Sequence, residues 1–413
     1  MNNLIKYEFI KIIKTKRVLI ATMILLVTVS LNIFNVSNEY FGEFSGIAAV
    51  KHQFNAQKNN SGPITGDKLK KITTYYHDIV YSPKNLNDPK DKTSGLTDEA
   101  FVKFSGKYSN FENLIIRATT PKGESTLNKS IVDISPDESS KIYDMRNINV
   151  EKYLNNSKVS SSTKEYLINK ISMMEKPLNY EPIRGWEQII RTIDDASGMF
   201  IMIVIAICLA PIFTNEYQTG VDNLILSSKK GRRELAISKF IAAFIFTTLF
   251  FLIFMTYIVI CNLILYGPTG ANTPIQALSY LWYSMYNMTF LQATLMIIGL
   301  SYLATLFYVS IIMIISVKSK KSFTSIILCL LLIFIPYFIY ATNSINDFSI
   351  ISKLMFLFPS NMTLGLKIIS SYIVFNFFNF VVPLPVIICI VSIIGILILL
   401  LMTMRSFYKH QVS

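Results

Sequence analysis

The side chains able to act as an acid, a base or a nucleophile gather in one polar stretch of the chain. His52, His77 and Asp78 are the candidates for base catalysis in this stretch. The nearest match to a nucleophile elbow, Gly123–Ser125, lacks the second glycine that this strained turn requires. We therefore interpret the histidines as surface residues and expect no catalytic residue in this chain.

Metal ligands have equally little support. Two acidic clusters, one of Asp133, Asp137 and Glu138 and one of Asp194 and Asp195, lack the spacing of a calcium-binding loop, and we interpret them as solvated charge. The four cysteines fall inside apolar runs without metal-type spacing, which leaves the polar stretch without a disulfide. We expect neither a metal site nor a cofactor site.

A nucleotide site is also missing from the sequence. The phosphate-binding pattern GxxxxGK[ST] occurs nowhere, so ATP and Mg²⁺ would have to be bound by a partner subunit, unless a gradient supplies the energy. A gradient-driven carrier commonly places ionisable groups inside its spans. The apolar runs contain essentially none, which disfavours proton coupling.

The composition is typical of a membrane protein. Of 413 residues, 52% are apolar and only 16% are charged. The excess charge of +13 lies almost entirely in short segments beside apolar runs, whereas residues 37–198 are close to neutral. This pattern indicates a membrane partner and no nucleic acid.

Six apolar runs meet or approach the roughly 20 residues that a transmembrane helix needs. They are Val18–Val36, Ala196–Phe213, Phe240–Tyr266, Met288–Val317, Ser322–Tyr340 and Val381–Met404. The second is the weakest, because it is short and ends near a proline. The sequence therefore predicts an all-α polytopic membrane protein, in which residues 1–36 form an interfacial helix and the first span, 37–195 an extracellular domain, and 196–413 the other spans.

Lysine and arginine set the expected orientation. They crowd before the first span, between the second and third, and between the fourth and fifth, whereas loop 267–287 carries none. We expect both termini in the cytoplasm. Before the first span, Leu4, Phe9 and Ile12 alternate with lysines, which favours a helix lying in the membrane interface over a plain positive flank.

Residues 37–195 predict a mainly helical or mixed α/β domain, rich in Lys, Asn, Ser and Asp with scattered aromatic residues. Candidate helices are 67–81, 98–111, 163–174 and 182–195, with Asp98 as an N-cap and the last helix running straight into the second span. Trp186 stands where an interfacial aromatic anchor is expected.

Residues 341–380 are too long and too apolar for a simple connection, and we interpret them as a re-entrant segment on the outer side. Four aromatic residues near its end predict a partly embedded helix; they are Phe375, Phe377, Phe378 and Phe380.

The loop between the second and third spans has a distinctive order of residues. Glu216 and Gly220 follow the second span, the apolar Leu224 and Ile225 come next, and Arg232 and Lys239 lead into the third. Apolar residues are unusual in a free cytoplasmic loop. The order resembles the first cytoplasmic loop of type-2 ABC exporter permeases, and Tyr7–Lys11 resembles the elbow helix of that family.

The resemblance implies that 214–239 is a cytoplasmic coupling loop, in which a helix from about Val221 to Arg233 seats in a groove of a cytoplasmic ABC ATP-binding subunit. The six junction residues would be Glu216, Gly220, Leu224, Ile225, Arg232 and Lys239. It also implies a second permease copy, as a homodimer or a related heterodimer, within membrane lipid. The simpler alternative is that Arg232 and Lys239 are only positive-inside charges and Gly220 is only a helix end.

We expect this chain to be the permease subunit of an ATP-driven exporter that moves an amphiphilic or hydrophobic substrate, such as a peptide antibiotic, a lipid or a drug. Two alternatives remain open: a membrane sensor or immunity protein whose extracellular domain binds a peptide or envelope component, and a membrane enzyme with an outer active site. The composition, rich in Lys, Ile and Asn, indicates a low-GC bacterium, and the absence of cysteine from residues 37–195 favours the cell membrane of a single-membrane, Gram-positive cell.

Overall fold

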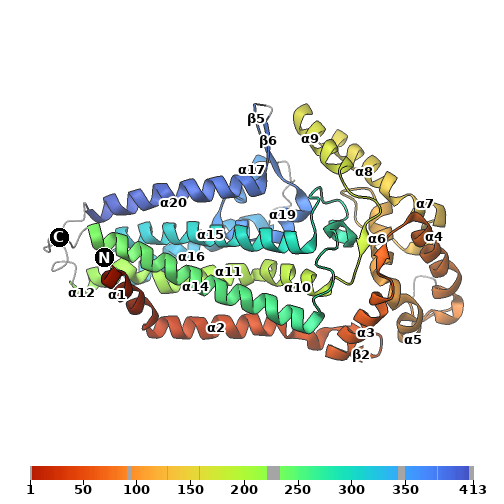
Figure 1. Ribbon diagram of the computed structural model, residues 1–413, viewed down its shortest axis with the longest axis horizontal. Coiled ribbons are helices and arrows are strands. Elements are labelled where there is room, and N and C mark those ends of the chain that lie inside the picture. Colours follow the sequence, from red (N-terminus) through yellow and green to blue (C-terminus); the bar gives the residue numbers. More distant parts are fainter. Residues whose placement is uncertain are drawn as a thin grey trace.

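The computed structural model of the chain describes residues 2–90, 95–127, 129–157, 159–220, 233–342, 349–378 and 380–408, without the side chains of 36, 37, 196 and 197. Six long apolar helical segments run along the same axis (Figure 1). They are α2 (Lys16–Ile33), α11 (Gly198–Leu209) continued by α12 (Pro211–Thr219), α14 (Arg233–Tyr266), α15 (Phe290–Lys318), α16 (Ser322–Thr342) and α20 (Leu384–Tyr408). The predicted all-α polytopic membrane fold with six spans is confirmed.

The second span lies at the centre of the bundle. Of its most apolar window, 78% is buried inside the protein, against 22% for α16 and for α20. A helix surrounded by other helices must be apolar on all sides, and α11 carries no charged residue. The run that was weakest by length is therefore the most enclosed span.

The second span continues past Pro211 and past its predicted end at Phe213. The helix continues to Thr219, with Pro211 at the first position of α12. Proline cannot donate a backbone hydrogen bond and disturbs the helical ladder. Here the hydroxyls of Ser316 and Ser325 both donate to the carbonyl oxygen of Ala210, at 2.7 and 3.1 Å, and so stabilise the break.

Residues 37–195, named the polar domain below, are mainly helical in their described part. The helices are α3 (Gly46–Lys58), α4 (Gly66–Tyr75), α5 (Asp98–Ala100), α6 (Ser109–Thr119), α7 (Pro136–Ser140), α8 (Ile142–Asn156), α9 (Ser161–Ser172) and α10 (Arg184–Thr192). Two short antiparallel pairs accompany them, β1 (Tyr40–Phe41) with β2 (Phe44–Ser45) and β3 (Gly62–Pro63) with β4 (Asn179–Tyr180).

Most of the helices expected in the polar domain are present. The expected helix 67–81 is α4 followed by a π-helical turn, Tyr76–Val80, and the helix expected at 163–174 is α9. The stretch 98–111 is broken into short pieces, and its cap is Thr97, whose hydroxyl accepts a hydrogen bond from the backbone N–H of Ala100. The prediction of Asp98 as the N-cap was wrong.

The polar domain joins the bundle through α10 and α8. Helix α10 runs through a π-helical turn, Ile193–Ser197, directly into α11, as predicted. Trp186 is buried and donates its indole N–H to the carbonyl of Pro268 at 3.0 Å, so its prediction as an interfacial anchor was wrong. On α8, the fully buried Arg146 donates to the carbonyls of Trp282 and Ser284 at 2.9 and 2.7 Å.

The segment before the last span ends in a β-hairpin. After the short helices α17 (Ile350–Met355), α18 (Pro359–Met362) and α19 (Gly365–Ser371), strand β5 (Val374–Phe377) pairs antiparallel with β6 (Phe380–Pro383). The embedded helix predicted for Phe375, Phe377, Phe378 and Phe380 is therefore wrong. Valine and phenylalanine dominate these strands, and both residue types favour extended backbone over helix.

Candidate functional site

Four charged side chains from three helices meet at the end of the bundle where the described chain begins with α1 and ends with α20 (Figure 1), which we name the terminal end. Helix α1 (Asn2–Ile13) packs against the beginning of α14 and contributes Glu8 and Lys11. The last turns of α12 contribute Glu216, and the second turn of α14 contributes Lys239. We call these four residues the ion cluster.

Lys239 is the centre of the ion cluster. Its ammonium donates to Glu8 Oε2 at 2.7 Å, to Glu216 Oε1 at 2.7 Å and to the carbonyl of Ile212 at 3.2 Å. The side chain of Lys239 is 0% exposed, and both carboxylates are buried with it. All three hydrogens of the ammonium therefore have acceptors, which a buried charge requires.

Lys11 closes the ion cluster from the solvent side. Its ammonium lies 2.6 Å from Glu216 Oε1 and 3.9 Å from Glu8 Oε1. Burial lowers the pKa of Lys11, but the hydrogen bond and charge of Glu216 outweigh this, so its pKa lies above the ordinary value. Two cations and two anions make the cluster neutral overall, which limits the cost of removing its charges from water.

Helix α12 is held on both sides at this level. On the side of α15 and α16, the backbone N–H of Phe213 donates to Ser316 Oγ at 3.1 Å, and the Thr214 hydroxyl lies 2.9 Å from that of Ser322. On the other side, the Phe213 ring lies 5.6 Å from the Lys239 ammonium and 5.2 Å from the ring of Phe407, near the end of α20. The ion cluster thus lies where most of the spans meet.

The structure brings together two of the six predicted junction residues. Glu216 and Lys239 are 23 positions apart and hydrogen-bonded. Gly220 is the C-cap of α12 with a φ of 68°, a left-handed conformation that favours glycine, and so it is a helix end. Three further residues fall outside the described part of the chain; they are Leu224, Ile225 and Arg232.

Sequence reasoning missed Glu8 and Lys11 as members of this site. Glu8 is the only acidic residue among the first 38, in a segment otherwise rich in lysine. An acidic residue inside a positive flank contradicts a purely topological role for that flank, and this signal could have identified it.

The structure does not bring together the two histidines that the sequence singled out. His52 stacks on the ring of Phe44 at 3.7 Å, and His77 Nε2 lies 3.1 Å from the carbonyl of Ile131, on separate elements. Within the described ranges, no group of three metal-type ligands comes together. The acidic pair at Asp194 serves structure instead, because its carboxylate accepts the backbone N–H of Leu366 at 2.9 Å.

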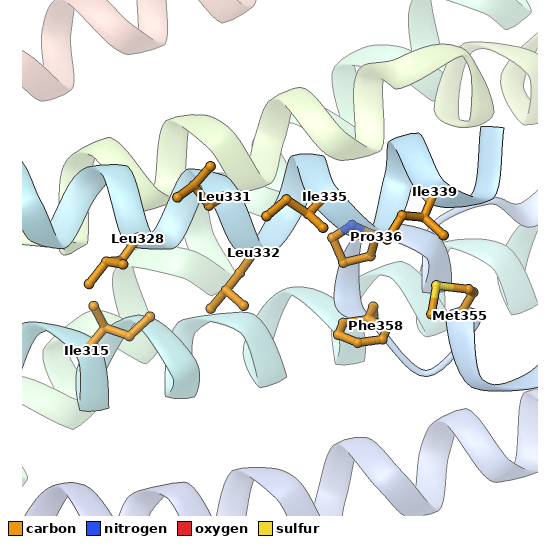
Figure 2. Close-up of a pocket in the computed structure, with 9 residues that line it drawn as sticks. All are labelled: Ile315, Leu328, Leu331, Leu332, Ile335, Pro336, Ile339, Met355 and Phe358. Atoms are coloured by element: carbon orange, nitrogen blue, oxygen red, sulfur yellow. The ribbon is translucent and has the colours of Figure 1, made fainter. Parts of the chain in front are cut away.

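A cavity of about 330 Å³ lies between α15, α16, the end of α17 and the chain that follows α17 (Figure 2). Its lining is entirely apolar and consists of Ile315, Leu328, Leu331, Leu332, Ile335, Pro336, Ile339, Met355 and Phe358. Such a cavity has no group for chemistry or for orienting a polar ligand. The cavity opens on the apolar outer face of α16, where Leu328, Leu331 and Ile335 are 44%, 44% and 51% exposed.

These features define a class of protein: a polytopic helical membrane protein whose buried charges lie at the base of a loop between two spans. The chain matches the description ABC-2 family transporter protein over residues 2–409. It therefore belongs to the ABC-2 transporter family, whose members are membrane components that work with an ABC ATP-binding subunit. No curated protein matches the chain.

Proposed function

We propose that this chain is the permease subunit of an ATP-driven exporter, and that the ion cluster transmits movement of an ATP-binding subunit to the spans. The observation that carries the proposal is that Lys239 forms one buried ion pair with Glu8 and another with Glu216. They join the elbow-like helix α1 to the two helices that enter and leave loop 221–232.

The geometry supports transmission of a force through this loop. The end of α12 and the beginning of α14 are locked together by the 2.7 Å contact between Glu216 and Lys239. A displacement of the loop therefore moves the second and third spans as one unit, with α1 attached through Glu8. Packed cores and buried pairs respond to such a push by discrete shifts, because they deform little.

The remaining parts of the proposal follow from charge and from apolar surface. We place the terminal end in the cytoplasm, since lysine and arginine concentrate there, and the polar domain outside a bacterial cell membrane. A second permease copy would complete the pathway. ATP and Mg²⁺ would bind the partner subunit, and the apolar cavity of Figure 2 favours an amphiphilic or hydrophobic substrate.

Purification of the tagged protein from its native host in a mild detergent tests this function. We expect a protein with a phosphate-binding loop to co-purify and to hydrolyse ATP, and we expect Ile225→Asp to abolish its recovery by placing a charge in the contact. Asp137→Ala, which removes an exposed charge of the polar domain, is the matched control and should retain the partner. Absence of any ATPase under several mild detergents would refute the exporter and favour a sensor.

Substitution within the loop base separates binding from transmission. Glu216→Ala and Arg232→Ala should leave membrane insertion and recovery of the ATPase intact, while ATP hydrolysis loses its coupling to transport. Coupled transport at the normal rate in both variants would contradict the role proposed for the junction.

A further inference from the structure

The β-hairpin β5–β6 exposes an unusual amount of aromatic surface. Phe377, Phe378 and Phe380 are 50%, 99% and 78% exposed, and we name them the aromatic tip. Residues 373–404, which comprise the hairpin and nearly all of α20, contain no charged residue. Exposed aromatic clusters without charge mark a surface that contacts something other than water.

The hairpin is continuous with the lipid-facing surface of the bundle. Strand β6 leads directly into α20, and the backbone N–H of Leu384 donates to the carbonyl of Ile373 at 2.9 Å. The exposed apolar face of α20 begins at Val386, within one helical turn of the hairpin. Lipid that covers this face therefore reaches the base of the hairpin.

The position of the hairpin in the bundle agrees with this. Figure 1 shows the hairpin projecting sideways from the bundle, at a level along the long axis that α2 and α14 still pass. At the end of α2 that leads into the polar domain, the apolar side chains of Leu31 and Phe34 are exposed. The aromatic tip thus lies at the depth of the leaflet on the side of the polar domain.

Neighbouring residues provide a polar boundary at the base of the hairpin. The ammonium of Lys353, on α17, lies 5.7 Å from the ring of Phe375, and Ile350 and Ile351 on the same helix are exposed. A lysine whose stem covers apolar surface can extend its charge to a lipid phosphate.

The hairpin is also held in a fixed direction. The side-chain amide of Asn376 donates to Ser160 Oγ at 2.7 Å and to Ser162 Oγ at 2.9 Å, at the beginning of α9. Phe378 has a φ of 47°, a left-handed conformation in which glycine or asparagine is normal. An aromatic ring is thus kept at the turn despite the conformational strain.

We propose that the aromatic tip inserts into the leaflet at the polar-domain end of the bundle, at the boundary between headgroups and acyl chains. This depth follows from the backbone, because the open edges of a hairpin need water or headgroup partners and cannot lie in pure hydrocarbon. The phenylalanine rings reach the acyl chains, and Lys353 faces the phosphates. The hairpin would anchor the polar domain to the membrane through α9, whether or not the exporter proposal holds.

Tryptophan fluorescence in reconstituted vesicles tests the insertion. The full-length Phe378→Trp protein is compared in phosphatidylcholine vesicles with and without bromine on the acyl chains, after subtraction of the signal of the unsubstituted chain with its buried Trp186 and Trp282. Leu127→Trp is the matched control, because Leu127 is 92% exposed in the polar domain.

We expect emission from Phe378→Trp to be shifted to the blue and quenched by brominated lipid, more strongly when bromine lies near the headgroup than near the chain end. Leu127→Trp should show neither effect. Emission that is blue-shifted but unquenched would place a second copy of the chain on the tip, and emission like that of the control would place water there. Either result overturns lipid insertion.

Discussion

Replacement of Lys239 by methionine removes the central charge of the ion cluster with little change of shape. Glu216 keeps Lys11 at 2.6 Å, whereas the nearest cation to Glu8 is then Lys11 at 3.9 Å. The variant therefore leaves one buried carboxylate poorly paired. Breaking a buried ion pair in this way costs about 3–5 kcal/mol.

Thermal unfolding in detergent, followed by the fluorescence of Trp186 and Trp282, measures this cost. At about 2 °C per kcal/mol for a large chain, Tm should fall by roughly 6–10 °C. The double variant Glu8→Gln with Lys239→Met restores neutrality, and it should recover most of the loss, because a neutral buried pair needs no counter-ion. Lys70→Met is the control, since its pair with Asp137 is exposed, and it should leave Tm unchanged.

A Tm for Lys239→Met within about 2 °C of that of the parent would contradict a buried ion pair of this strength, because so small a shift corresponds to less than such a pair should contribute. A double variant as unstable as the single one would contradict it as well. In that case the loss would come from packing of the lysine stem, and the charge of Glu8 would not matter.

Two further predictions concern the junction between the polar domain and the bundle. Burial raises the pKa of Asp194 to about 6, whereas an ordinary aspartate carboxyl has a pKa of 3.8. The native state therefore binds this proton more tightly than the unfolded state does. Protonation of Asp194 stabilises the fold below about pH 4, and this stabilisation is lost as the pH rises from about 4 to 6. Asp194→Asn should therefore raise the Tm at pH 7.5, because it stabilises the native state by up to about 3 kcal/mol at that pH, and it should have no effect below pH 4. A change of Tm that does not depend on pH would contradict this. Arg146→Met leaves the carbonyl of Trp282 without its donor and the carbonyl of Ser284 with only the longer contact from Gln276 Nε2 at 3.3 Å, so it should cost about 2–3 kcal/mol. Arg146→Lys, which keeps one donor, should cost less, and equal Tm values for the two variants would refute the role of these hydrogen bonds.

The number and limits of the spans were largely predictable, because length and hydropathy are local properties. A helix satisfies its own backbone hydrogen bonds in lipid, so an apolar run of sufficient length has few other structures available. The largest deviations were in the second span, which continues through the break at Pro211 to Thr219 instead of ending at Phe213, and in the third span, which is already helical at Arg233 instead of Phe240. The hydroxyls of Ser316 and Ser325, more than 100 positions away, stabilise the break, and no local pattern reveals them.

The hairpin and the polar domain were less predictable for the same reason. The phenylalanines of 375–380 fit either an embedded helix or a strand, because short apolar runs carry no decisive period. Pairing of β5 with β6 and the contacts of Asn376 with α9 decided between the two.

The sequence by itself determined that this chain is a six-span membrane protein with basic flanks and a large polar domain, since these follow from composition along the chain. It also identified Glu216 and Lys239 as notable residues. Only the tertiary structure decided that Lys239 pairs with Glu8, which lies 231 positions earlier. Contacts between buried charges depend on how distant helices pack, and that packing is a property of the whole bundle.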